Sequence, residues 1–320
     1  MNFKEVVEGK ARIIVPDVEI PESARAYGFY NPSMKTNRNI SIDVARHYRP
    51  EKILDAFTAT GVRAIRYCKE VGGDVHGCDV NQMALELAKR NARMNGCQIK
   101  FHFGDWRKLD EGFDLIDIDP YGSPCAHVDR AFQMIRNGGL VFVTATDVAA
   151  LNGVYPLTSL RRYWVESKCV DYSKELGARI LLSFVIREGA KYDKAFTPIL
   201  TYQERHYIRV MGRVEKGARK TNDLLEKFSR TEHGFLYMGK IQNVDFDSDE
   251  KIVNLARNEV DVPFYYDIHK ISKRFKAKLK PMEYIIGKLR ELGYEASRTV
   301  FSPTGIKTNA DESVVAEVLK

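Results

Sequence analysis

The chain has 320 residues, 44% of them hydrophobic and 29% charged, which is typical of a folded globular protein with room for two domains. It contains no run of about 18 apolar residues, and its charged first segment is not typical of a secretory signal, so we expect no membrane association. The five cysteines form no CxxC pair, which predicts a reducing, cytoplasmic setting and neither a disulfide framework nor a metal site. The net charge of +7 permits binding to nucleic acid without requiring it.

Short β-branched runs alternate with helical patterns through the first half of the chain. They predict strands at residues 52–57, 74–80, 99–106, 113–120 and 140–147. Between the second and third runs, the amphipathic segment 83–96 predicts a helix that ends at the Asn95-Gly96 pair. Such alternation specifies βαβ units and therefore an α/β fold, in which helices cover both faces of a parallel sheet.

The later segments complete this sheet and begin a second domain. A long helix is predicted over 173–192, and two alternating segments, 196–203 and 206–214, predict an antiparallel hairpin that brings the sheet to seven strands. We place the domain boundary near 216–220, which gives an α/β domain at 1–216 and a smaller α+β domain at 217–320. The second domain is expected to hold helices at 222–228, 268–275 and 282–292 and strands at 235–241 and 294–301.

The turn after the first predicted strand reads DAFTATG, from Asp55 to Gly61. Enzymes that bind dinucleotides place GxGxxG in this turn, because several glycines let the backbone cradle a pyrophosphate. Only one glycine is present here, so the turn suits an adenosine-type ligand without phosphate, such as S-adenosylmethionine. An ordinary tight turn of a parallel-sheet protein is the alternative.

Carboxylates follow each of the first three predicted strands, at Asp55, Asp79 and Asp105. Asp79 can accept hydrogen bonds from both hydroxyls of a ribose, a device that NAD enzymes share. Asp105 can accept from an adenine amino group, although a solvated loop acid would look the same. Three acids after three successive strands predict an adenosine pocket at one edge of the sheet.

The fourth predicted strand ends in DIDPYGSP, residues 117–124. Enzymes that methylate exocyclic amines place an acid or amide, a proline and an aromatic residue there. The carboxylate of Asp119 can accept from the amine and turn its lone pair toward a methyl group, Pro120 stiffens the turn, and Tyr121 can stack on a base. Guanine presents two adjacent donors, which suits an acceptor-only carboxylate, although an adenine amine remains possible.

With these motifs the chain resembles the archaeal tRNA dimethyltransferases that modify N2 of the guanine at position 26. The segments that carry the resemblance are FYNPSMKTNRN (29–39), ILDAFTATGVRAIRY (53–67), DVNQMALELAKRNARMNG (79–96), DLIDIDPYGSP (114–124) and FSPTGIKTNA (301–310). The resemblance implies a Rossmann-like class I methyltransferase sheet, S-adenosylmethionine as the cofactor, tRNA as the partner, and no obligate protein partner.

The resemblance also implies roles for individual residues. Asp119 would be the main catalytic residue, with Pro120 and Tyr121 beside it, and Phe29 and Asn31 would contact the substrate. The cofactor would be bound by Arg38, Asp55, Ala59, Thr60, Gly61, Arg63, Asp79, Val80, Asp105 and Trp106. The guanidinium of Arg38 has the geometry to bind the cofactor's methionine carboxylate through two hydrogen bonds.

The predicted second domain carries a cluster of six cations without an intervening acid, which we call the basic cluster. Its members are Lys270, Lys273, Arg274, Lys276, Lys278 and Lys280. Apolar residues at 271, 275 and 279 give it helical spacing, so that one side would pack and the other would bind phosphates. We expect Lys273, Arg274 and Lys276, together with Lys307, to contact the substrate; a solvated helix face is the alternative.

Other functions remain open at this point. An NAD-dependent oxidoreductase would share the sheet and Asp79 but would want GxGxxG. A methyltransferase acting on adenine N6 or on a protein amide would more often carry asparagine at position 119. A non-catalytic RNA-binding module would have no need of the acids at positions 55, 79, 105 and 119.

Overall fold

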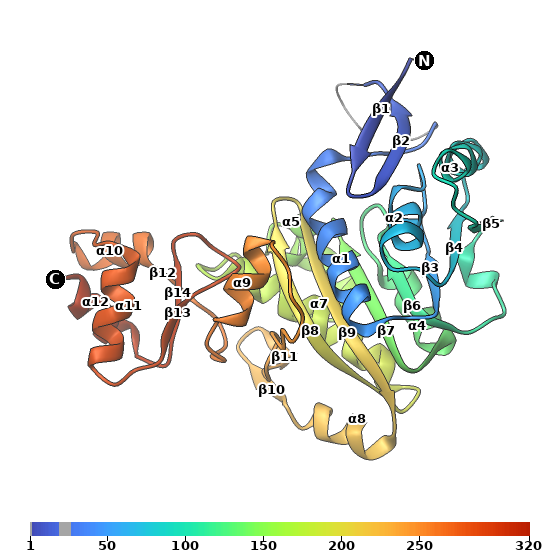
Figure 1. Ribbon diagram of the computed structural model, residues 1–320. Coiled ribbons are helices and arrows are strands. Elements are labelled where there is room, and N and C mark those ends of the chain that lie inside the picture. The colour runs from blue at the N-terminus through green and yellow to red at the C-terminus, as the bar shows by residue number, and fades with distance from the viewer. Residues whose placement is uncertain (1, 19–26) are drawn as a thin grey trace. The chain divides into compact units, whose positions relative to one another are not determined.

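The computed structural model describes residues 2–18 and 27–320 (Figure 1). By contacts between residues the chain divides into two compact units. The first comprises Met1–Val143, Arg213–Lys216 and Phe246–Glu250, and the second comprises Thr144–Gly212, Gly217–Asp245 and Lys251–Lys320. The assignment of 1–216 and 217–320 as two domains stays a prediction. In the described part of the chain, no helix is long and apolar enough to cross a membrane.

The seven-stranded sheet expected from the sequence is present, with the strand order β5-β4-β3-β6-β7-β9-β8. Its strands are β3 (Lys52–Asp55), β4 (Asp74–Asp79), β5 (Lys100–Phe103), β6 (Phe113–Ile118), β7 (Ile135–Ala145), β8 (Lys194–Glu204) and β9 (Tyr207–Lys216). The pairs β3/β4, β4/β5, β3/β6 and β6/β7 are parallel. The central strands are apolar runs buried on both faces, which a sheet covered by helices requires.

Helices connect these strands as the βαβ pattern predicts. They are α1 (Lys35–Tyr48), α2 (Val62–Glu70), α3 (Gln82–Met94), α4 (Cys125–Met134), α5 (Val148–Leu151), α6 (Pro156–Tyr163) and α7 (Ser173–Ala190). Helix α3 begins at the side-chain cap of Asn81 and ends at Asn95, followed by Gly96 at φ +64°, as its sequence indicates. Helix α7 is buried along nearly its whole length, which fits its long apolar run.

The strand order creates the place for a ligand. Strand β3 lies between β4 and β6. From β3 the sheet extends through β4 to β5 on one side, and the chain then crosses back to form β6 and β7 on the other side. Ligands of open α/β sheets bind at such a switch point, beyond the carboxyl ends of the strands. Asp55 ends β3 and Asp119 directly follows β6, so the switch point lies between these two acids.

Two predicted strands of the large sheet differ most from the structure at their ends. β7 begins at Ile135, earlier than predicted. The Gly138-Gly139 pair favours a loop, but an irregularity in the pairing of β7 with β6, between Phe113 and Leu115, accommodates this pair within the strand. β5 is shorter than predicted and ends at Phe103. Asp105 instead caps the short helix η3 (Trp106–Lys108) by accepting from the backbone N–H of Arg107.

An N-terminal hairpin was not among the expected elements. It consists of β1 (Phe3–Glu8) and β2 (Ala11–Pro16) and is followed by η2 (Pro32–Met34) and α1. Its turn requires glycine at Gly9, where φ is +54° and a Cβ atom would lie 2.4 Å from Glu70. The buried side of the hairpin packs with α2 and α3 in a small core that includes Ile13, Val15 and Ile65.

The C-terminal region agrees with the sequence in kind and differs in detail. Its elements are α8 (Ala218–Leu225), β10 (Phe228–Thr231), β11 (Gly234–Tyr237), α9 (Lys251–Arg257), β12 (Tyr266–Asp267), α10 (Ile268–Phe275), α11 (Met282–Glu291), β13 (Ala296–Arg298), β14 (Gly305–Thr308) and α12 (Glu312–Leu319). The strands β12-β14-β13 form a small sheet that shares a hydrophobic core with α10, α11 and α12. Strand β14 and helix α12 had no counterpart among the predicted elements.

The helical spacing expected through Leu279 is wrong. Helix α10 ends at Phe275, because Lys276 adopts a left-handed conformation at φ +51° and the N–H of Ala277 bonds back to the carbonyl of Ser272. Leu279 therefore lies outside the helix and is exposed.

Candidate active site

The turn after β3 holds its shape through backbone contacts to β4. The N–H of Ala59 donates to Asp79 Oδ2 at 2.8 Å, and the N–H of Thr58 donates to the carbonyl of Cys78 at 2.9 Å. Gly61 begins α2 at φ +82°, where a Cβ atom would lie 3.0 Å from the Ala88 side chain. The turn thus needs glycine at position 61 for both its conformation and its close approach to α3.

Asp79 has the position expected of an acid that binds a ribose. Its Oδ1 accepts from the N–H of Asn81 at 2.8 Å, while Oδ2 accepts from Ala59. Burial raises the pKa of Asp79, and the backbone hydrogen bonds partly offset this. A carboxylate has four lone-pair positions, so both oxygens can still accept from ligand hydroxyls. Val80, which follows it, is exposed and can contact a ligand.

Asp55 is buried, and neither of its carboxylate oxygens has a hydrogen-bond partner among the described residues. Burial raises its pKa to about 7; Arg63 opposes this shift, and Asp117 adds to it. The hydroxyl of buried Thr60 also lacks a partner in the described structure. Native proteins seldom leave buried polar groups unsatisfied, so these atoms indicate a ligand with hydrogen-bond donors.

An aromatic wall stands beside Asp105. The ring of Trp106 stacks on His127 of α4 with centroids 6.1 Å apart, and Phe57 meets the same imidazole edge-on at 4.9 Å. The indole Nε1 and the Nδ1 of His127 have no partner in the described structure. Burial lowers the pKa of His127, and the charge of Arg107 lowers it further.

Asp105 itself already forms an ion pair. Arg107 donates to Oδ1 through Nε at 3.0 Å and to Oδ2 through Nη2 at 2.7 Å, and holds the pKa of this carboxyl at about 2. Arg107 also donates to the carbonyl of Ala126, which ties the loop after β5 to α4. An adenine amine would therefore share Asp105 with an arginine.

Asp119 lies at the carboxyl edge of the sheet and forms an ion pair with Arg63. The Nη2 of Arg63 binds Asp119 Oδ2, and its Nη1 binds Asp117 Oδ2 at 3.1 Å and Ser41 Oγ at 3.1 Å. Although burial alone would lower it, the pKa of Arg63 is raised well above its ordinary value by the two aspartates. Tyr67 completes the group by donating to Asp117 Oδ2 at 2.7 Å.

This arrangement leaves one oxygen of Asp119 available. Its Oδ2 is taken by Arg63, and its Oδ1 has no partner among the described residues. Arg63 was predicted to contact the cofactor; the structure places it against Asp119, where it fixes the orientation of the carboxylate. The free oxygen can accept a hydrogen bond from a ligand amine.

Tyr121 and Phe29 form an aromatic corner next to Asp119. Their ring centroids are 4.9 Å apart with the planes at 78°, and half of the Tyr121 surface is exposed. An exposed ring of this kind offers a stacking surface to a base. Asn31, the other predicted substrate residue, has a local role: its side chain caps η2 by accepting from Ser33.

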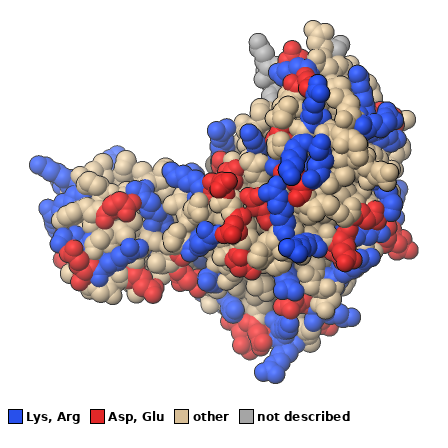
Figure 2. All heavy atoms as spheres, in the orientation of Figure 1, with Lys and Arg blue, Asp and Glu red and all other residues tan. Residues whose placement is uncertain are grey.

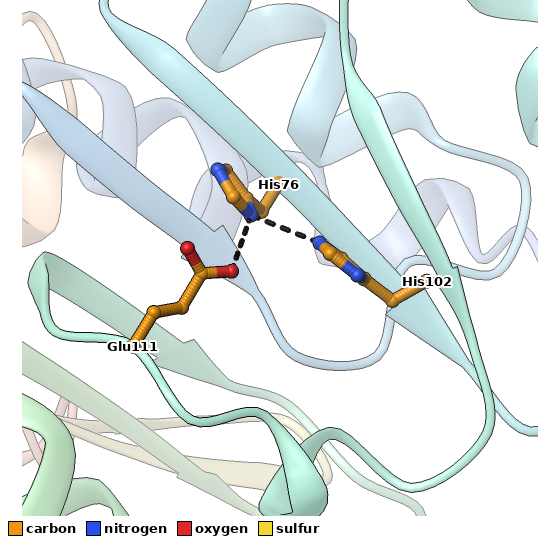
Figure 3. Close-up of side chains that lie close together, drawn as sticks. All are labelled: His76, His102 and Glu111. Atoms are coloured by element: carbon orange, nitrogen blue, oxygen red, sulfur yellow. Dashed lines mark hydrogen bonds and ion pairs between the residues drawn. The ribbon is translucent and has the colours of Figure 1, made fainter.

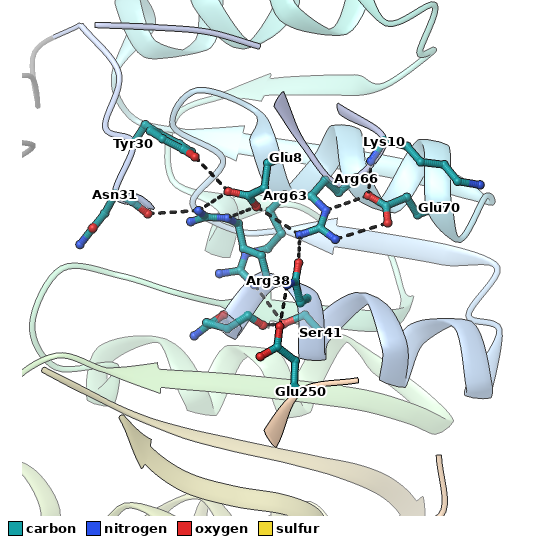
Figure 4. A network of polar contacts seen from close by, with 12 residues as sticks. Glu8, Lys10, Tyr30, Asn31, Arg38, Ser41, Arg63, Arg66, Glu70 and Glu250 are labelled. Atoms are coloured by element: carbon teal, nitrogen blue, oxygen red, sulfur yellow. Dashed lines mark hydrogen bonds and ion pairs between the residues drawn. The ribbon is translucent and has the colours of Figure 1, made fainter. Parts of the chain in front are cut away.

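Arg38 belongs to a buried network that joins the N-terminal hairpin to α1 and α2 (Figure 4). Its Nε and Nη2 bind the two oxygens of Glu8, each at 2.6 Å, and its guanidinium lies 5.2 Å from the ring centre of Tyr30. Arg66 also binds Glu8, at 3.1 Å, and continues the network to Glu70. The predicted contact of Arg38 with the cofactor carboxylate stays a prediction, and Glu8 is a partner that the sequence did not indicate.

Half of the basic cluster is already engaged within its own unit. Lys270 and Arg274 bind Asp171 at 3.0 and 2.8 Å, and Lys280 donates to a backbone carbonyl of α12. Lys273, Lys276 and Lys278 are exposed and have no ion-pair partner in residues 2–18 and 27–320. Figure 2 shows basic and acidic side chains interspersed over the visible face, so these lysines form a local feature.

Lys307 is in a different environment from the basic cluster. It is 1% exposed, and its Nζ binds Glu175 of α7 at 3.1 Å and Glu259 at 2.6 Å. Arg179 binds the same Glu175 at 2.9 Å. In this state its ammonium is inaccessible to a phosphate, so substrate binding by Lys307 would require two buried ion pairs to open.

The chain matches the family described as TRM, N2,N2-dimethylguanosine tRNA methyltransferase, over residues 9–248 and 240–320. It belongs to this family. The membership bears out the resemblance seen in the sequence and leaves the oxidoreductase and protein-amide alternatives without support.

Relatives of this description and a solved structure are similar to the chain over its full length. The tRNA (guanine(26)-N(2))-dimethyltransferase of Pyrococcus horikoshii is 35% identical, with 100% of this chain and 99% of the relative covered. The enzyme of the same description from Thermococcus kodakarensis is 34% identical, with both chains fully covered. The structure of Trm1 from Pyrococcus horikoshii in complex with S-adenosyl-L-methionine superposes with a TM-score of 0.90 at 32% identity, covering 99% of this chain and 100% of the other.

Proposed function

We propose that this chain transfers methyl groups from S-adenosylmethionine to the exocyclic N2 of guanine 26 in tRNA, forming N2,N2-dimethylguanosine. The full-length similarity to enzymes of that description supports the reaction and the substrate. The observation that carries the proposal is the single available oxygen of Asp119, held by Arg63 beside the exposed ring of Tyr121.

The residues at the carboxyl edge fit S-adenosylmethionine. Asp55 offers two buried oxygens without a donor, which suits the ammonium of a methionine group, and Asp79 suits the ribose. Asp105 and the wall of Trp106 and His127 suit an adenine, and the indole N–H that has no partner in the described structure can donate to it. When bound, this cofactor supplies an electrophilic methyl group on its sulfonium.

Asp119 orients the nucleophile. The amine nitrogen of guanine is a weak nucleophile, because its lone pair is delocalised into the ring. Oδ1 of Asp119 accepts a hydrogen bond from N2–H and draws the nitrogen toward a geometry in which its lone pair is directed outward. As the methyl group bonds to the nitrogen, the proton of N2 passes to this oxygen. Arg63 prevents the carboxylate from rotating, and Tyr121 holds the base by stacking.

The same contact can serve both methylations. A monomethylated amine retains one N–H, and one hydrogen bond is all that the free oxygen of Asp119 requires. A mechanism that needed both N–H groups of the amine would stop after the first transfer. We therefore assign both steps to the same carboxylate oxygen.

The second unit contributes contacts to the phosphates of the tRNA. Lys273, Lys276 and Lys278 are exposed and unpaired in the described structure, which suits contacts to phosphates. Arg274 is already paired with Asp171 and Glu312, so it can contribute only by sharing these ion pairs. We place the reaction in the cytoplasm; the five free cysteines agree with a reducing compartment.

The experiment that tests Asp119 compares Asp119→Ala with the wild type. Labelled S-adenosylmethionine is incubated with an unmodified tRNA transcript, and the affinity for S-adenosylhomocysteine is measured by calorimetry. We expect methyl transfer to be lost and the ligand affinity to change by no more than a few fold, because Asp119 contacts the base. Asp110→Ala, which removes an exposed acid, is the control. Wild-type turnover in the Asp119 variant would contradict the mechanism.

A further inference from the structure

Three side chains of the first unit converge outside the methyl-transfer site (Figure 3). They are His76 of β4, His102 of β5, and Glu111 of the segment that leads into β6. The Nδ1 of His76 lies 2.9 Å from His102 Nε2 and 3.2 Å from Glu111 Oε1. All three atoms lie within 4.8 Å of one another. The far nitrogen of His76, Nε2, lies 3.1 Å from Asp74 Oδ2.

Neutral imidazoles satisfy only part of these contacts. If the proton of His76 is on Nε2, it bonds to Asp74, and Nδ1 can accept from the Nε2–H of His102, but the carboxylate of Glu111 then faces the lone pair of Nδ1 without a donor. If the proton is on Nδ1, the lone pair of Nε2 faces Asp74 instead. His76 is 1% exposed, so water cannot relieve either repulsion. A cation among the three atoms, which is either a further proton or a metal ion, removes the repulsion.

The third atom favours a metal ion over a proton. A proton on Nδ1 can be donated well to only one of the two acceptors around it, whereas a metal ion binds all three atoms. The Nε2 of His102 presents its lone pair to the ion when the ring carries its proton on Nδ1. With a metal at Nδ1, the N–H of His76 at Nε2 is left to donate to Asp74, the contact that orients most metal-binding histidines.

We propose that His76, His102 and Glu111 bind a divalent metal ion of the zinc type, with Asp74 orienting His76. Zinc–nitrogen bonds of about 2.0–2.1 Å place neighbouring ligands of a tetrahedral site about 3.3 Å apart. The two contacts of His76 Nδ1, at 2.9 and 3.2 Å, are close to that spacing. His102 and Glu111 are only half-buried, so a water molecule can supply the fourth ligand.

The ligand chemistry selects the ion. Two imidazoles and one carboxylate suit zinc and its neighbours, whereas magnesium and calcium prefer oxygen ligands. Lys52 binds the other oxygen of Glu111, and Lys100 binds Asp74 at 2.9 Å. These lysines fix the carboxylates in place, and their charge opposes any weakly bound hard cation.

The ion would hold the edge of the sheet. Strand β5 is an edge strand of four residues with little burial, and its end leads directly to Asp105. An ion bound by His102, by His76 of β4 and by Glu111 would fix the register of β5 against the interior strands. The histidines are far apart in the sequence and form no metal motif, so sequence spacing could not indicate this site.

The test is zinc titration of protein stripped with a chelator, followed by calorimetry. We expect one zinc ion per chain, no heat from magnesium, and a rise in melting temperature. His102→Ala should abolish this binding, and Asp74→Asn, which alters only the outer contact, should weaken it by roughly 10–100-fold. His269→Ala, which removes an exposed histidine outside the cluster, should bind as the wild type does.

Retained binding of S-adenosylhomocysteine shows that each variant is folded. Wild-type zinc affinity in His102→Ala or Glu111→Gln would overturn the proposal. It would also fail if the ring-nitrogen signals of His76 in nitrogen-15 spectra showed two bound protons and did not change on zinc addition. Neither result bears on the methyltransferase assignment, which is measured separately by transfer to tRNA.

Discussion

The carboxylates at the carboxyl edge of the sheet differ in the hydrogen-bond donors that surround them. Asp79 and Asp105 have donors already, from the backbone and from Arg107, whereas Asp55 has none among the described residues. The sequence places these acids at strand ends and cannot show this difference, which depends on which donors the fold brings to each oxygen. Arg63 is the clearest case, because its partners Asp117 and Asp119 come from a strand that is distant in the sequence.

Asp55 makes the stability of the unliganded protein depend on pH. The pKa of its side chain is about 7 in the fold, against an ordinary value of 3.8. Between these values the folded state retains a proton that the unfolded chain has lost, so Asp55 lowers stability progressively as the pH rises from about 4 to about 7. In Asp55→Asn this loss is absent. The free energy of unfolding of the variant, measured by urea denaturation, should therefore rise relative to that of the wild type as the pH increases over that range.

Two comparisons make this pH effect specific. Asp110→Asn removes an exposed carboxylate, and the pH dependence of this variant's stability should follow that of the wild type. Saturating S-adenosylhomocysteine brings an ammonium to the cofactor edge and should flatten the wild-type curve. A constant difference between Asp55→Asn and the wild type from pH 4 to 7 would show that Asp55 is ionised throughout.

At the scale of elements, a buried ion network holds β14 to α7. Lys307 of β14 binds Glu175 of α7 and also Glu259, which accepts in turn from the N–H of Val300. Arg179 is a second cation on Glu175. Lys307 therefore separates two carboxylates that would otherwise share a buried site with a single cation.

Replacing Lys307 should destabilise the second unit. Lys307→Met keeps most of the side-chain volume but leaves Glu259 buried without its cation, at a cost of about 3–5 kcal/mol in the free energy of unfolding. Lys288→Met is the matched control, because its partner Glu291 is exposed and one turn away on the same helix; its effect on the free energy of unfolding should be small. Equal stability of the two variants, measured by chemical denaturation, would mean that the network adds nothing.

The elements that follow from the sequence are those with a regular pattern of their own. Local residues predict the βαβ alternation, both ends of α3 and the long apolar helix α7. The N-terminal hairpin was not predicted, because its strands are buried only by packing on α2 and α3. The burial of Lys307, which was predicted to contact the substrate, was not foreseen for a similar reason: a lone lysine carries no signal of the two carboxylates that the fold places beside it.

At the scale of the whole molecule, binding to tRNA should depend on salt through the unpaired lysines. Lys273→Gln, Lys276→Gln and Lys278→Gln together remove three exposed charges of the basic cluster. If each contacts one phosphate, the slope of log affinity against log salt should fall in magnitude by about 2–3. Affinity for S-adenosylhomocysteine should be unchanged, and turnover at saturating tRNA should survive, because Asp119 is untouched.

A control with the same change in net charge separates phosphate contacts from a general effect. Lys89, Lys191 and Lys288 each form an ion pair with an acid three residues away. Replacing these three by glutamine should leave the salt slope close to that of the wild type. A basic-cluster variant with the wild-type slope would show that its lysines are a solvated surface.

We propose that Asp119 presents the exocyclic N2 of guanine 26 for methylation, and the sharpest test is a tRNA synthesised with inosine at position 26. Inosine keeps the ring, the N1–H and the carbonyl of guanosine and lacks only the N2 amine. We expect dimethylguanosine at position 26 of the guanosine tRNA by nucleoside analysis, no methyl incorporation into the inosine tRNA, and similar binding of both. Equal methylation of the two tRNAs would contradict the account, because the methyl group would then be going to another atom.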